Sequence, residues 1–327
     1  MTRVAAVDCG TNTIRLLVAD LTREETGRPR LEPLRRRNEI VRLGQGVDRT
    51  GLLDHAALER TLAVVEDYAA DCAELGVEPG RGARRFVATS ATRDARNRED
   101  FAAGVRSLLG VDPEVVSGQE EAHLSFAGSL LGARGTDDGG APRLVVDLGG
   151  GSTELVLGVD APAAAISLNT GSVRITERYL ADGVSPAAEA AARAEVRGLL
   201  DRAAQAVDLA ATGRLVGLAG TITTVTAHAL GLTDFDAEAI DGAELSVETT
   251  LASCDAIVHS TAAERESWAY LRPGRRDVIA AGALVWSEVI SRVVAETTAA
   301  GRPLATAVTS LHDILDGIAL SLAVPVP

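Results

Sequence analysis

The sequence predicts an α/β protein built from two domains. Its 327 residues exceed what a single hydrophobic core usually supports. Hydrophobic residues make up 46% of the chain and aromatic residues only 3%. Val, Leu, Ile and Ala must therefore fill the interior, as they do in parallel sheets covered by Ala-rich helices. A glycine-rich segment near the start of the chain also recurs near its middle, which indicates one copy in each domain.

The repeat pairs residues 5–18 with residues 144–157. A shift of 139 positions places Asp147 on Asp8, Gly149 on Gly10 and Ser152 on Thr13. Each copy reads as an apolar strand, the pattern D-x-G-x-x-[ST] and a second apolar strand. Two copies at matching positions of two half-length segments favour a duplication over chance.

Other elements follow from local patterns. Asp54 is a suitable N-cap for a helix that ends at Gly76. We expect further helices over residues 118–132, 187–207, 276–298 and 311–323, and strands over residues 86–88 and 215–219. These elements give an N-terminal domain over residues 1–130 and a C-terminal domain over residues 131–309, with the helix in residues 310–327 packing back on the first.

Composition restricts the function classes. The net charge of −14 argues against a nucleic-acid polymer or a membrane surface as partner, and no apolar run is long enough to span a bilayer. All 32 basic residues are Arg, which excludes a P-loop lysine. The three cysteines, Cys9, Cys72 and Cys254, are scattered, as is typical of a reducing cytoplasm. Any metal should be a hard cation bound by oxygen, because no His/Cys cluster is visible.

The two repeated loops are candidate phosphate sites. A tight glycine-rich turn directs successive backbone N–H groups into one concavity, which binds phosphate oxygens without a basic side chain. Asp8 and Asp147 suit a divalent cation shared with the phosphates, because a carboxylate repels phosphate directly. An ordinary β-hairpin is the alternative for either loop alone. The expected phosphate ligands are Gly10, Thr11, Asn12, Thr13, Gly149, Gly150, Gly151, Ser152 and Thr153.

Four further groups have weaker patterns. Gly220 and Thr221 follow a strand and begin a helix, where N-terminal amides favour anions, although a packing turn fits equally well. Arg93 follows a strand in a hydroxyl-rich turn and could bind phosphate bidentately or remain solvated. Arg272, Arg275 and Arg276 flank a Pro-Gly pair and suggest a surface role. Residues 35–37, three consecutive arginines, read as a solvated face or as the lining of a polyanion groove.

Taken together, the motifs resemble those of the exopolyphosphatase and guanosine pentaphosphate phosphohydrolase family, Ppx/GppA. The matching segments are DCGTNTIRLL, ATSATRDARN, SGQEEAHL, DLGGGSTEL and GLAGTITTV. This resemblance implies two ribonuclease-H-like domains of the acetate kinase, sugar kinase, heat-shock chaperone and actin superfamily, closing on phosphates. It also implies magnesium-dependent release of the terminal phosphate of inorganic polyphosphate, with Mn²⁺ as an alternative metal.

Glu121 is the expected general base, with Arg93 offsetting charge in the transition state. Ser117 and Glu120 have the spacing of a capping box, in which Glu120 turns back to the N-cap amide. Glu121 points about 100° further around the helix and is left for catalysis. In the family, the catalytic glutamate precedes an alanine, which also selects Glu121. Glu154 is the second choice, as a metal ligand beside Asp147 and Asp8.

The resulting prediction is a cytoplasmic exopolyphosphatase, expected as a homodimer. Longer family members carry extra C-terminal domains, and their lack here predicts a preference for short chains. The main alternative is a guanosine pentaphosphate or nucleoside triphosphate phosphohydrolase that uses the same residues. A kinase of the same fold and a non-catalytic guanosine tetraphosphate or polyphosphate sensor remain further alternatives.

Overall fold

A computed structural model describes residues 2–23, 29–80, 82–132 and 140–323. The chain divides into two compact units, one made of residues 1–128 together with residues 314–327 and the other of residues 129–313. The first unit is therefore discontinuous in sequence. Among the described residues, no helix is both long and apolar enough to cross a membrane.

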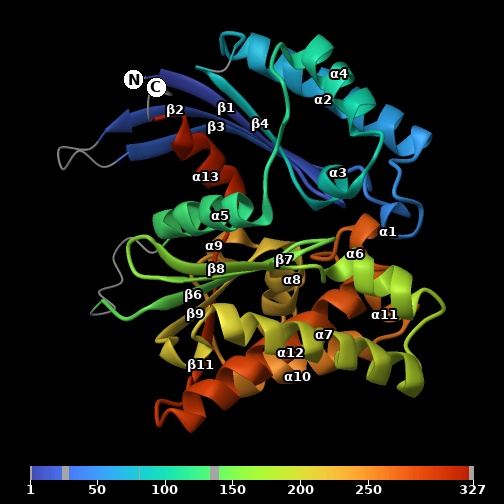
Figure 1. The fold of residues 1–327 in the computed structure, drawn as a ribbon, viewed down its shortest axis with the longest axis vertical. Coiled ribbons are helices and arrows are strands. Elements are labelled where there is room, and N and C mark those ends of the chain that lie inside the picture. Colours follow the sequence, from blue (N-terminus) through green and yellow to red (C-terminus); the bar gives the residue numbers. More distant parts are fainter. Residues whose placement is uncertain (1, 24–28, 81, 133–139, 324–327) are drawn as a thin grey trace. The chain divides into compact units, whose positions relative to one another are not determined.

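The first unit contains a mixed sheet of strand order β3-β2-β1-β4-β5 (Figure 1). Strands β1, β2 and β3 form an antiparallel meander, whereas β4 pairs in parallel with β1, and β5 in parallel with β4. The strands are β1 (Thr2–Cys9), β2 (Thr13–Arg23), β3 (Pro29–Ile40), β4 (Arg84–Ala88) and β5 (Glu114–Val115). The helices are α1 (Val47–Thr50), α2 (His55–Glu74), α3 (Ser90–Asp94), α4 (Arg98–Leu109), α5 (Gly118–Gly132), which continues into the second unit, and α13 (Ile314–Ser321).

Both faces of this sheet are buried, and the alternation of side chains along β1 shows how. Val7 belongs to the apolar cluster that contains Tyr68 of α2 and Phe101 of α4. Val4, on the other face, belongs to the cluster that contains Ile318 of α13. The C-terminal helix thus completes a core begun by the first strand, as Figure 1 shows for α13 beside β1–β3. A continuous run of apolar residues in β1 follows from burial on both faces.

The arginine run in β3 alternates between these two faces. Arg35 and Arg37 bind Asp71 of α2, at 2.6 and 2.9 Å. Arg36 binds Asp316 of α13, at 2.5 Å. The three arginines therefore bind helices on both faces of the edge strand β3. This structural role differs from the two that the sequence suggested, a solvated face and the lining of a polyanion groove.

The second unit repeats the topology of the first. Its sheet has strand order β10-β11-β9-β6-β7-β8, in which β6, β7 and β8 form an antiparallel meander and β9 pairs in parallel with β6. The strands are β6 (Arg143–Leu148), β7 (Thr153–Gly158), β8 (Pro162–Leu168), β9 (Arg214–Leu218), β10 (Glu244–Ser246) and β11 (Thr306–Thr309). The predicted α/β class and the duplication are therefore confirmed by the two matching sheets.

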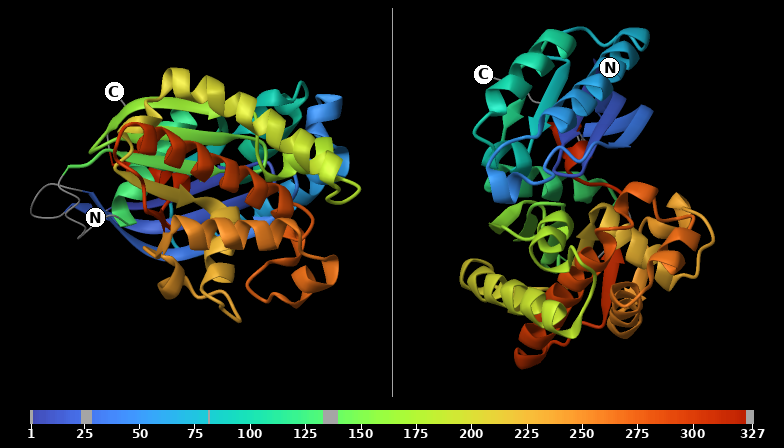
Figure 2. Two further views of the ribbon diagram at one scale, coloured as in Figure 1. Left: turned by 90° about the horizontal axis from the view of Figure 1, so that it is seen from below. Right: turned by 90° about the vertical axis from the view of Figure 1, so that its right-hand side faces the viewer.

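Helices pack against this second sheet in one apolar cluster that includes the buried Trp286. The long helices α7 and α12 lie side by side, yellow-green and orange-red in Figure 2. The helices are α6 (Ser172–Ile175), a π-helical turn (Thr176–Leu180), α7 (Pro186–Ala206), α8 (Ala219–Ala229), α9 (Ala237–Ile240), α10 (Val247–Val258), α11 (Ala262–Ser267) and α12 (Ile279–Ala299).

Most predicted helices have the expected ends. Asp54 caps α2 and accepts a hydrogen bond from the amide of Ala57. The helix predicted from residue 276 begins only at Ile279, because a 3-10 turn over Pro273–Arg275 precedes it. The helix predicted over 311–323 is shorter at both ends, since α13 begins at Ile314 and ends at Ser321.

We predict that Gly317→Ala destabilises the first unit. An added Cβ would lie 2.0 Å from the carbonyl oxygen of Leu124, so α13 or α5 would have to shift. The expected loss is about 1–3 kcal/mol of unfolding free energy, the range for overpacked cores. Gly198→Ala is the matched control, because a Cβ there meets open space on α7 and should add about 0.5–1 kcal/mol. Urea unfolding measures both, and equal effects of the two changes would contradict the tight packing of α13.

Candidate functional site

The two repeated loops have the same hydrogen-bonded turn. The amide of Gly10 donates to the carbonyl oxygen of Thr13 at 2.9 Å, and the amide of Gly149 donates to that of Ser152 at 3.0 Å. Each loop follows the carboxyl end of a strand, β1 or β6, that has a parallel neighbour, β4 or β9. This edge of an α/β sheet is where ligands usually bind.

In the first loop, the backbone carbonyls accept hydrogen bonds from amides of the segment that follows β3. The carbonyl oxygen of Thr11 accepts from the amide of Gly44 at 2.8 Å, and that of Asn12 accepts from the amides of Val41 and Arg42 at 3.0 and 2.9 Å. The amides of Thr11 and Asn12 donate to no acceptor in the described part of the chain. Arg42 has a positive φ of 52°, an unfavourable conformation kept at this contact.

The second loop is supported by α6, an element that sequence reasoning missed. The amides of Ser172, Val173 and Arg174 donate to the carbonyl oxygens of Gly149 and Gly150. Within the described residues, the amides of Gly150, Gly151 and Ser152 have no acceptor. Gly171 was a usable signal, because a glycine between a strand and a polar turn often permits a close approach of two backbones.

Not every predicted phosphate ligand faces these amides. The hydroxyl of Thr153 is fully buried and donates to the carbonyl oxygen of Thr170 at 2.8 Å. This hydroxyl stabilises the base of the loop and is not available to a ligand. The hydroxyl of Thr11 lies 2.9 Å from that of Ser90, so the start of α3, which follows β4, contributes to the first loop.

The acids that open the two loops have cross-strand neighbours of opposite charge. Asp8 lies opposite Arg15 and accepts from its Nε and Nη2 at 2.9 and 2.6 Å. Asp147 lies opposite Glu154, the residue that occupies the place of Arg15 in the second copy. Asp147 and Glu154 are both buried, and Glu154 accepts a hydrogen bond from the hydroxyl of Ser167 at 2.7 Å. The first loop thus pairs an acid with a base, whereas the second brings two acids together.

This difference bears on the predicted metal site. Two carboxylates in neighbouring strand positions are the hard oxygen donors that Mg²⁺ binds. The described residues contain no group of three or more His, Cys, Asp or Glu side chains arranged as a metal site. A cation held by Asp147 and Glu154 would therefore complete its coordination with phosphate oxygens and water, as Mg²⁺ commonly does. Asp8 fits such a role less well because Arg15 already binds it.

Glu120 and Glu121 have the separate environments that the helical phase predicted. Glu121 is only 7% exposed, and its Oε2 accepts from Nη1 of Arg93 at 3.1 Å. Arg93 also donates to the carbonyl oxygen of Val116. Arg93 is therefore placed to orient Glu121 rather than as the isolated phosphate ligand that its sequence position suggested.

The capping box is only half formed. The hydroxyl of Ser117 accepts from the amide of Glu120 at 3.2 Å, as predicted. The carboxylate of Glu120 does not return to the N-cap amide, because Oε1 instead accepts from Arg85 at 2.8 Å. Glu120 still has a structural contact at the surface, but with β4 and not with its own helix.

Cys9 ends β1 beside the first loop, which raises the question of a thiol nucleophile. The side chain is buried, and burial together with the charge of neighbouring Asp8 raises the pKa of the Cys9 thiol well above its usual value. A thiolate is the nucleophilic form of cysteine. Cys9 is therefore a core residue, and water is the better nucleophile for this site.

The third candidate loop joins β9 to α8. Nη1 of Arg275 lies 1.1 Å from the position that a Cβ on Gly220 would take, so the guanidinium rests directly on this turn. The surface role expected for Arg275 is therefore wrong. Ala219 has a positive φ of 71°, a strained conformation for a residue with a side chain. Strain of this kind tends to be kept where a loop must present its backbone to a ligand.

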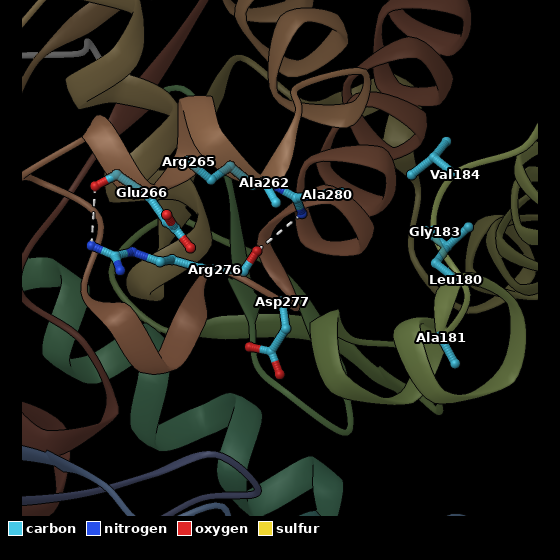
Figure 3. Close-up of a pocket in the computed structure, with 10 residues that line it drawn as sticks. All are labelled: Leu180, Ala181, Gly183, Val184, Ala262, Arg265, Glu266, Arg276, Asp277 and Ala280. Carbon is cyan, nitrogen blue, oxygen red and sulfur yellow. Dashed lines mark hydrogen bonds between the residues drawn. The ribbon is translucent and has the colours of Figure 1, made fainter.

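A cavity of about 330 Å³ lies in the second unit, beyond this turn (Figure 3). Leu180 and Val184 line one side, and Arg265, Glu266, Arg276 and Asp277 line the other. Arg276 donates to the carbonyl oxygen of Glu266, and Arg265 to that of Arg276. Two arginines and two acids give the lining no net charge, so this cavity does not suit a polyanion.

Comparison with known proteins places these observations in a family context. The sequence profile of the Ppx/GppA phosphatase family matches residues 21–299. Exopolyphosphatase 2 of Mycobacterium tuberculosis is 44% identical over 329 aligned residues, which cover 99% of each chain. A bifunctional 3-dehydroquinate synthase/phosphatase of Fusobacterium nucleatum is 30% identical over 88% of this chain and 43% of its own length.

Solved structures agree over the whole chain. The crystal structure of an exopolyphosphatase-like protein superposes with a TM-score of 0.90 at 43% identity, covering 98% of this chain and 97% of the other. A Ppx/GppA family member from Aquifex aeolicus has a TM-score of 0.76 at 25% identity, with the same coverage of 98% and 97%. An exopolyphosphatase from Cytophaga hutchinsonii reaches 0.83 at 23% identity over 98% of both chains, a likeness of fold alone.

Proposed function

Because the chain belongs to the Ppx/GppA phosphatase family, we propose that it is an exopolyphosphatase, which releases the terminal phosphate of inorganic polyphosphate. The observation that carries this function is the pair of loops with the same turn, each presenting successive amides that have no acceptor in the described chain. Such a nest binds phosphate oxygens without basic side chains. An acidic protein with a net charge of −14 requires local binding of this kind to hold a polyanion.

Hydrolysis needs an activated water and stabilisation of the charge on the transferred phosphoryl group. Glu121 accepts a proton from the attacking water, whose oxygen forms the new bond to the terminal phosphorus. The bridging P–O bond breaks, and the shortened chain leaves with its negative charge. The hydrogen bond from Arg93 fixes the orientation of the Glu121 carboxylate. Loop amides stabilise the charge on the non-bridging oxygens.

Asp147 and Glu154 are the proposed ligands of Mg²⁺ or Mn²⁺. A metal held by these two residues would neutralise charge on the phosphate oxygens. This assignment rests on the two carboxylates facing each other across β6 and β7. Asp8, which the sequence also suggests as a metal ligand, is instead paired with Arg15, and this pair fixes the base of the first loop.

The function is tested by measuring phosphate release from four substrates in parallel: short polyphosphate, long polyphosphate, guanosine pentaphosphate and ATP. We expect polyphosphate to give the highest kcat/KM, since the loops recognise phosphates and no base-specific contact is needed. The two polyphosphate lengths test the predicted preference for short chains. Faster hydrolysis of guanosine pentaphosphate than of either polyphosphate would identify the alternative activity.

Glu121→Gln should lower kcat by about 10²–10⁴-fold, because it keeps the shape of the side chain but removes the base. Polyphosphate binding should persist or tighten, since a negative charge near the substrate is lost. Glu120→Gln is the matched control, and its activity should stay within about threefold of the parent, because its contact with Arg85 lies at the surface. A dead Glu120 variant beside an active Glu121 variant would reverse the assignment.

The affinity for the metal should distinguish the roles of Asp147, Glu154 and Asp8. Asp147→Asn and Glu154→Gln should each raise the half-saturating Mg²⁺ concentration about tenfold or more, as lost coordination contacts do. Asp8→Asn should leave it within about threefold. Mn²⁺ binding followed by electron paramagnetic resonance gives the same comparison without turnover. An equal shift for Asp8→Asn would place all three acids at the metal.

Two further expectations accompany this function. Cys9, Cys72 and Cys254 are buried free thiols, which suits the cytoplasm. A homodimer is still our prediction for the oligomeric state, and sedimentation analysis tests it.

A further inference from the structure

The support of the second loop includes one charged side chain. The amide of Ser172 donates to the carbonyl oxygen of Gly149 at 3.1 Å, and those of Val173 and Arg174 donate to that of Gly150 at 2.9 and 3.1 Å. The remaining carbonyl, that of Gly151, accepts from Nε of Arg174 at 2.7 Å. The carbonyls of all three loop glycines are thus bound from the side of α6.

The direction of these carbonyls fixes the direction of the amides. Within a trans peptide group, the C=O and N–H bonds point in opposite directions. Carbonyls bound by α6 therefore turn the amides of Gly150, Gly151 and Ser152 away from α6. Each of these peptides is also polarised, because a hydrogen bond to the carbonyl strengthens the N–H of the same peptide as a donor.

Arg174 differs from the other supports in its charge and its burial. The residue is 9% exposed, so its field is screened less than that of a surface arginine. Hydrogen bonds from a charged donor are about twice as strong as neutral ones. The peptide that Arg174 polarises joins Gly151 to Ser152, and its N–H belongs to Ser152.

The first loop shows that a charged support is not needed for the turn itself. There, within the described residues, the carbonyls of Thr11 and Asn12 accept hydrogen bonds only from the backbone amides of Gly44, Val41 and Arg42. The same turn forms in both loops. The guanidinium behind Gly151 is therefore an addition to the second loop, beyond what its conformation requires.

Gly171 allows α6 to approach closely enough for this contact. A Cβ at this position would lie 2.6 and 2.7 Å from the carbonyl oxygens of Gly150 and Gly149. Only a residue without a side chain can precede α6 at this distance. The loop and α6 thus form one unit, although Arg174 lies 23 positions after Gly151 in the chain.

We propose that Arg174 is a positioning residue of the phosphate site, which acts through the Gly151–Ser152 peptide to make the Ser152 amide a stronger donor to a phosphate oxygen. The proposal rests on the proposed function in that the ligand is a phosphate chain. Arg174 does not contact the substrate in this scheme. It strengthens binding in the ground state and the transition state alike, so its loss should raise KM more than it lowers kcat.

The test compares Arg174→Gln and Arg174→Ala with Arg178→Gln. Arg178, four residues on, binds Glu195 at the surface and serves as the control. We expect Arg174→Gln to raise both the KM and the tripolyphosphate dissociation constant about tenfold, with kcat within about threefold. The control should match the parent. Added guanidinium ion should restore binding to Arg174→Ala, which a merely misfolded variant would not show.

A spectroscopic readout separates polarisation from loss of structure. In Arg174→Gln, the amide proton of Ser152 should move upfield, while the amide signals of β6 and β7 keep their positions. Unchanged tripolyphosphate affinity or an unchanged Ser152 signal would overturn the proposal. A parent protein that binds tripolyphosphate without hydrolysing it would refute the proposed function and leave the Arg174 comparison valid. A parent that binds no phosphate chain would refute both.

Discussion

A peptide group cannot turn its amide toward a ligand without turning its carbonyl toward something else. Both candidate phosphate loops depend on this constraint. In each unit, a separate segment binds the loop carbonyls: residues 41–44 in the first and residues 172–174 in the second. The surrounding fold places these two segments next to the carbonyl side of each loop. The β-meanders supply the turns, and the two-sided packing of each sheet holds the supporting segments in place.

This arrangement also accounts for strained backbone near the loops. Arg42 and Ala219 are non-glycine residues with a positive φ, and both lie at candidate phosphate loops. Such a conformation costs of order 1–3 kcal/mol and persists only where the surrounding structure fixes it. The amide of Arg42 uses it to reach the carbonyl of Asn12. Backbone geometry, more than side-chain chemistry, therefore defines these sites.

The sequence predicted the local features and missed the long-range ones. The duplicated D-x-G-x-x-[ST] pattern identified both loops because every residue of the turn lies within six positions. Helical phase separated Glu121 from Glu120 for the same reason. By contrast, Arg174 acts on Gly151 across two strands, β7 and β8, and α6 is only four residues long, without a side-chain cap that would mark it. The difference between Arg15 and Glu154 was visible in the repeat, but only the register of the strands shows that each faces the acid of its own loop.

The discontinuity of the first unit has a consequence for how the protein is made. Residues 129–313 form a continuous segment with its own core, so this unit can fold as soon as it has left the ribosome. The first unit, although synthesised earlier, exposes the face of β1 that carries Val4 until α13 emerges. The part made first therefore finishes folding last. During that interval an apolar sheet face is exposed to chaperones or to aggregation. A truncation before Ile314 should therefore lower the solubility of the N-terminal half of the chain more than that of the segment next to the cut.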